Sequence, residues 1–160
     1  MKKFIYGIAR LTFNGIVIGW IEKGSFDWGG SKGEKVDVEA EQVPNTPVLT
    51  LVTKNGTLSP TFNLIQLDYK GLKQVAGGTL VGPEEAPTGW KAPADLVELR
   101  GESVLDFVSG QTWTASNTLL MSNLAGKLTL TEVSKMECQL YINVPEDGGA
   151  PYEINDTVEG

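Results

Sequence analysis

The side chains of this sequence that could act as general acids or bases are mainly carboxylates, because histidine is absent and Cys138 is the single cysteine. These absences exclude a histidine base, a Ser-His or Cys-His triad, an intrachain disulfide, and a zinc site built from His and Cys. The carboxylates form three candidate pairs, Glu84-Glu85, Asp37 with Glu39, and Glu146-Asp147. A glycosidase needs two carboxylates about 5–10 Å apart across a cleft, but no motif supports such a site, and solvated surface carboxylates are far more common. We therefore expect that the protein is not an enzyme.

The charge balance also limits the possible ligands. No segment has the regular Asp/Asn spacing of a calcium loop, so we expect no metal and no cofactor. The chain has 13 basic and 20 acidic residues and a formal net charge of -7. A surface of this sign repels phosphates, which makes specific nucleic-acid binding improbable.

Four tryptophans provide the other chemically distinctive groups. Trp20 and Trp113 lie in strand-like patterns that favour burial, whereas Trp28 and Trp90 lie in loops rich in glycine or proline. Exposed aromatic rings at Trp28 and Trp90 could stack on sugars or contact a protein. A carbohydrate-binding or adhesive β-sandwich module therefore remains an alternative function.

The length of 160 residues and a hydrophobic content of 41% fit one folded domain. We assign residues 1–145 to this domain and residues 146–160 to an acidic tail that is extended or disordered until something binds it. No apolar run is long enough to span a membrane. The N-terminus does not resemble a signal peptide, so we expect synthesis in the cytoplasm.

Turn signals divide the domain into short strands. Asn14-Gly15 and Asn55-Gly56 each lie between strand-like runs, as in type I′ hairpins, so we expect residues 48–53 to pair with residues 58–64. Asp68 is expected to cap a short helix that ends at Gly77-Gly78. We expect further strands at 96–99, 104–108, 112–121, 127–133 and 137–144, with long loops at 24–33 and 82–93. The predicted fold is all-β with one short helix, an antiparallel β-sandwich or barrel.

One predicted strand has an acidic face. Residues 36–41 alternate apolar and acidic side chains, which places Asp37, Glu39 and Glu41 on the same side of an extended chain. On the residues alone this is an ordinary solvated strand face that is purely acidic. Cys138 lies on the apolar side of a later strand and should be buried.

The N-terminal part of the chain contains a series of short motifs: Gly7-Ile8-Ala9-Arg10-Leu11-Thr12-Phe13-Asn14-Gly15, then Ile18-Gly19, and Phe26-Asp27-Trp28-Gly29-Gly30 followed by Glu34. This pattern resembles that of phage tail tube proteins and the related haemolysin-coregulated tube proteins of type VI secretion. The resemblance covers roughly residues 7–41, with weaker similarity at 58–72 and 110–114.

This resemblance implies a tail-tube-like fold and a structural role. Subunits would form hexameric rings that stack into a tube, and DNA would pass through it without specific binding. Partners would be other copies of the chain and other tail components, and the protein would end up in the virion tail of a phage or prophage. Asp37, Glu39 and Glu41 would be candidates for the lumen, because carboxylates repel DNA phosphates. Phe26 and Trp28 would be candidate anchors for ring stacking.

Overall fold

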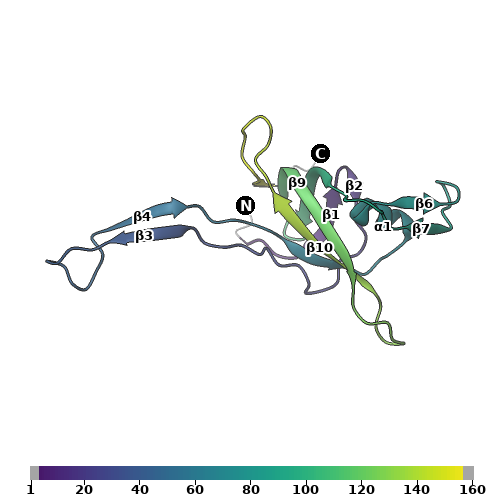
Figure 1. Ribbon diagram of the computed structural model, residues 1–160, viewed down its shortest axis with the longest axis horizontal. Helices are drawn as coiled ribbons and strands as arrows, with labels where there is room; N and C mark the ends of the chain where they lie inside the picture. The colour runs from purple at the N-terminus through teal and green to yellow at the C-terminus, as the bar shows by residue number, and fades with distance from the viewer. Residues whose placement is uncertain (1–3, 157–160) are drawn as a thin grey trace.

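A computed structural model describes residues 4–156, in which antiparallel strands predominate and one short helix is present (Figure 1). The main sheet has the order β2-β1-β8-β9-β10-β5, and β11 also pairs with β9. Its strands are β1 (Ile8–Phe13), β2 (Ile16–Val17), β5 (Thr61–Leu64), β8 (Leu99–Phe107), β9 (Gln111–Ala125), β10 (Lys135–Ile142) and β11 (Glu153–Asp156). Two separate two-stranded ladders pair β3 (Glu34–Val38) with β4 (Leu49–Lys54) and β6 (Thr79–Val81) with β7 (Gly89–Lys91). The all-β prediction is confirmed at this level, as a β-rich, sandwich-like architecture.

Strand β9 organises the sheet. It pairs along one edge with β8, and along the other with β11 near its start and β10 near its end. The register with β8 shifts between Gly101 and Ser103, and the buried positions of β9 change there from Trp113 and Ala115 to Thr118 and Leu120. A bulge of this kind bends the ladder and re-aims its side chains, so both halves of β9 contribute to the core.

The core lies on one face of this sheet. Its largest fully buried apolar side chains are Trp113, Phe62, Leu11, Leu105, Met136, Leu140 and Val75. Cys138 is buried among them, as predicted, and burial raises the pKa of its thiol to about 12 because the thiolate loses its hydration.

Two local predictions are confirmed. Asn14 and Gly15 adopt φ values of 54° and 82° between β1 and β2, as a type I′ turn requires. Helix α1 (Tyr69–Ala76) is capped at its N-terminus by Asp68, whose carboxylate accepts a hydrogen bond from the Gly71 amide at 2.9 Å. It ends at Gly77, with a φ of 75°.

The second predicted hairpin is wrong. Strand β4 pairs with β3 and β5 pairs with β10, and neither Asn55 nor Gly56 has the positive φ of a type I′ turn. The chain instead continues in extended form from β4 toward β5. Residues 24–33 run beside this segment, with Asp27 bridging Thr61 and the Ser31 amide donating to the Thr57 carbonyl at 2.9 Å. The expected loop is therefore part of a long two-stranded ribbon.

Three other boundaries differ from the sequence predictions. The expected loop at 82–93 contains β7, which pairs with β6 because Gly82 turns the chain back with a φ of 87°. Residues 127–133 form no strand, and Leu128 and Leu130 are largely exposed in the connection between β9 and β10. The predicted tail contains β11, so part of it is extended and paired within the chain; residues 157–160 lie outside the described part.

In the part of the chain that the structure describes, no helix is both long and apolar enough to cross a membrane.

Candidate assembly surface

The feature that distinguishes this molecule is an arm that projects from the body, formed by residues 31–57 and built on the ladder of β3 and β4 (Figure 1). Val36 lies opposite Leu51, and Val38 lies opposite Leu49. Because side chains alternate across a strand, these four residues share one side of the ladder, which we call the apolar face. Val36, Val38, Leu49 and Leu51 are 51%, 40%, 52% and 48% exposed, respectively. No other described element covers this face.

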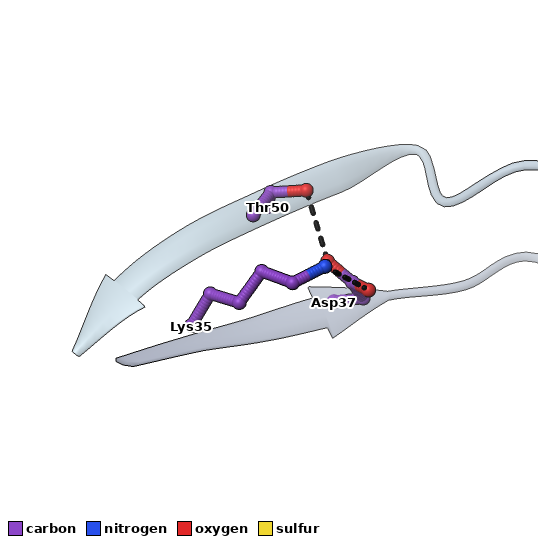
Figure 2. A network of polar contacts seen from close by, with 3 residues as sticks. All are labelled: Lys35, Asp37 and Thr50. Carbon is purple, nitrogen blue, oxygen red and sulfur yellow. Dashed lines mark hydrogen bonds and ion pairs between the residues drawn. The ribbon is translucent and has the colours of Figure 1, made fainter. Parts of the chain in front are cut away.

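The opposite side of the ladder, the polar face, carries Lys35, Asp37, Thr50 and Val52. Figure 2 shows Lys35 extending along β3 to Asp37, where its Nζ lies 3.0 Å from Oδ2, while the Thr50 hydroxyl donates to Oδ1 at 3.0 Å. The ammonium of Lys35, and then the Thr50 hydroxyl, hold the pKa of Asp37 below its ordinary value. The polar face thus combines a hydrogen-bonded network with the exposed Val52, whereas the apolar face carries aliphatic side chains alone.

The predicted acidic face is corrected by this geometry. Strand β3 ends at Val38, and Ala40 bridges Val43 in the turn that follows. Glu39 and Glu41 therefore lie beyond the strand, in the connection at the tip of the arm. The face that carries Asp37 is not purely acidic, since Lys35 neutralises this carboxylate. Whether any of the three carboxylates lines a channel stays a prediction.

Phe26 and Trp28 do not project from a free loop as the sequence analysis expected. Both pack against the core where the arm begins. The Trp28 ring lies 5.7 Å from that of Trp113, 6.0 Å from that of Phe107 and 5.2 Å from that of Phe26, measured between centroids. Phe26 in turn stacks on Phe62. These rings secure the base of the arm to the body.

The other tryptophans also differ in part from expectation. Trp113 is buried as predicted, but Trp20 is 74% exposed. Trp20 lies outside the strands, because the chain turns away from β1 at the end of β2 and crosses to β5, where Ile21 bridges Leu64. Trp90 is half-buried on β7, and its indole N–H donates to the Gly77 carbonyl at 2.8 Å. The proposed sugar-stacking residues, Trp28 and Trp90, thus each have a ring engaged within the fold, in different packing environments.

Sequence reasoning placed valines and leucines on strand faces but missed that the apolar face of the arm is uncovered. The available signal was the pair of proline residues, Pro44 and Pro47, between two strand-like runs. They indicate a long connection that joins β3 to β4 rather than a break between separate hairpins.

Comparison with known proteins gives no assignment: no family model matches this chain, and no curated protein matches it significantly. Among residues 4–156, no group of three or more His, Cys, Asp or Glu side chains is placed to hold a metal ion.

Proposed function

We propose that this protein is a structural subunit that assembles with copies of itself through the arm, as a ring-forming component of a phage or prophage tail tube. The observation that carries the proposal is the apolar face of the arm. A two-stranded hairpin alone is marginally stable in water, and it normally needs further strands or a helix against its apolar side. In this chain the arm extends away from the body (Figure 1), so a second molecule is the natural cover.

The apolar face is large enough to matter energetically. Complete burial of a Val or Leu side chain is worth about 1.5–3 kcal/mol. The four side chains of the apolar face are each close to half exposed, so covering them contributes roughly 3–6 kcal/mol per contact before the entropy cost of association. One such contact alone is weak. In a closed ring the same contact is repeated between every pair of neighbouring subunits, so its free energy contributes once per subunit.

The tube assignment rests on the sequence resemblance together with this assembly surface. A repeating head-to-tail contact closes into a ring or continues as a filament, and both occur in a stacked-ring tube. The net charge of -7 gives such a tube walls that repel DNA phosphates, so DNA would pass without specific binding. Glu39 and Glu41 form no ion pair with any residue in the described range 4–156 and lie at the arm tip, so they are better candidates for an uncompensated negative surface than Asp37.

In this proposal the partners are further copies of the chain and neighbouring tail components. The protein is made in the bacterial cytoplasm and ends up in the virion tail. Its role is structural, and no catalytic residue, metal or cofactor is assigned.

The proposal is tested by light scattering over a concentration series, with negative-stain images of the same samples. We expect the molar mass to rise with concentration and the images to show rings or tubes with a central hole. A molar mass near 17.2 kDa at every concentration, with no rings in the images, would contradict the proposal.

A further inference from the structure

A groove of about 740 Å³ lies between the outer edge of β1 and the segment at residues 17–26. Its apolar lining includes Ile8, Leu11, Ile18, Trp20, Ile21 and Phe26. Strand β2 pairs with β1 only at Thr12 and Phe13, and the Ile18 amide donates to the Leu11 carbonyl at 2.8 Å. The N-terminal part of β1, near Ile8, has no β2 partner, and its edge faces the groove. The groove therefore presents both an open strand edge and an apolar surface.

Trp20 is the most exposed side chain of this lining. Its backbone is held firmly, since its N–H donates to Gln66 Oε1 at 3.2 Å and its carbonyl accepts from the Ile65 amide at 3.0 Å. The indole nevertheless remains 74% exposed. A large aromatic ring on a fixed backbone beside an apolar groove is typical of a contact that dominates a protein interface.

We propose that this groove receives the apolar face of the arm from a second copy of the chain. The inference rests on the proposed self-assembly and names the surface that the arm contacts. The groove cannot be filled by its own arm without reversing the chain, because residues 20–26 lead directly into the base of that arm, which then runs away from the body (Figure 1). Each copy thus carries one arm and one groove, which is the arrangement of a head-to-tail interface.

The tip of the arm and the rim of the groove carry unpaired charges of opposite sign. At the groove, Arg10 pairs with Asp106 and Glu22 pairs with Lys135, whereas Lys23 makes no ion pair within residues 4–156. On the arm, Glu39 and Glu41 at the tip likewise make none with the described residues. An incoming arm would therefore bring unpaired carboxylates to a rim that has an unpaired ammonium, which favours this occupant over a cationic one.

The test uses two variants that each disable one side of the contact. Leu51→Asp places a charge on the apolar face and leaves the groove intact; Trp20→Asp places a charge in the groove and leaves the arm intact. Both residues are substantially exposed, so both variants should fold. We expect each alone to need at least tenfold higher concentration than the wild type to associate, as measured by sedimentation velocity.

Mixing the two variants is the decisive step. The Trp20→Asp copy supplies a functional arm and the Leu51→Asp copy a functional groove, so an equimolar mixture should form a 1:1 dimer that grows no further. If wild type assembles but the mixture stays monomeric, or if Trp20→Asp assembles like wild type, the groove is not the receiving site and this inference is wrong, while the arm-based function stands. If wild type itself never associates, both fail.

A disulfide provides a second readout. Trp20→Cys and Leu51→Cys variants, mixed and oxidised, should give a covalent heterodimer, because the native Cys138 is buried and does not compete. Val52→Cys, on the polar face of the same strand, is the matched control and should cross-link at least tenfold less. Equal cross-linking by Leu51→Cys and Val52→Cys would overturn the proposed orientation of the arm.

Discussion

Replacement of Trp28 by alanine tests whether this ring secures the arm to the body or serves as a free contact. Truncation of a fully buried tryptophan costs about 3–5 kcal/mol, and Trp28 is half-buried with three aromatic neighbours. We therefore expect Trp28→Ala to lower the free energy of unfolding by about 2 kcal/mol. For a chain of this length that loss corresponds to a decrease in Tm of roughly 4–8 °C.

The measurement is urea unfolding followed by far-UV circular dichroism, at a concentration low enough that association adds no stability. Trp20→Ala is the control, because its side chain is largely exposed and its loss should change stability by less than about 0.5 kcal/mol. Equal stability of Trp28→Ala and wild type, or a similar loss in both variants, would refute the packing assigned to Trp28.

Three further predictions concern single residues. Cys138, whose pKa burial raises to about 12, should not react with a disulfide reagent at pH 8 until the protein unfolds, whereas Val52→Cys should react at once; rapid reaction of the native thiol would contradict its burial. Gly29→Ala should cost at least ~1 kcal/mol more than Gly15→Ala, because both glycines have positive φ but of the two only the Gly29 Cβ would collide with a neighbouring atom, the Ser59 carbonyl oxygen. Equal urea midpoints for the two variants would be inconsistent with this close approach. The pKa of Asp37 is lower in the folded protein than in the unfolded chain. The ionised Asp37 therefore stabilises the fold at pH values above the unfolded pKa, and this stabilisation is lost as the pH falls through the folded pKa. Lys35→Met should raise the pKa of Asp37 in an NMR titration, and an unchanged value would mean that the contact of Figure 2 does not form in solution.

Local signals in the sequence predicted the parts of the fold that depend on neighbouring residues. The turn at Asn14-Gly15 needs two positive φ values, which this pair adopts readily. The cap at Asp68 needs one side-chain acceptor beside the first amides of a helix. Each of these requirements involves only a few adjacent residues, so the turn and the cap can be predicted from the local sequence.

The choice of strand partner could not be predicted in the same way. Residues 49–54 have the aliphatic and β-branched composition of a strand, but composition does not say whether β3 or β5 lies beside them. The same limit explains the tryptophans, since the burial of Trp28 depends on Phe107 and Trp113, which are distant in sequence. It also explains the arm: the valines of β3 have a strand pattern whether or not another surface covers them.

In the proposed assembly, another copy of the chain covers the apolar face of the arm. The most direct measurement compares the weight-average molar mass of Leu51→Asp and Val52→Asp by light scattering at one high concentration. These neighbouring residues lie on opposite faces of β4, and Val52 is 70% exposed on the polar face. We predict that Val52→Asp assembles like wild type and that Leu51→Asp stays near the monomer mass. If Leu51→Asp has the same molar mass as the assembled wild type, or if both variants lose assembly equally, the apolar face is not the assembly surface.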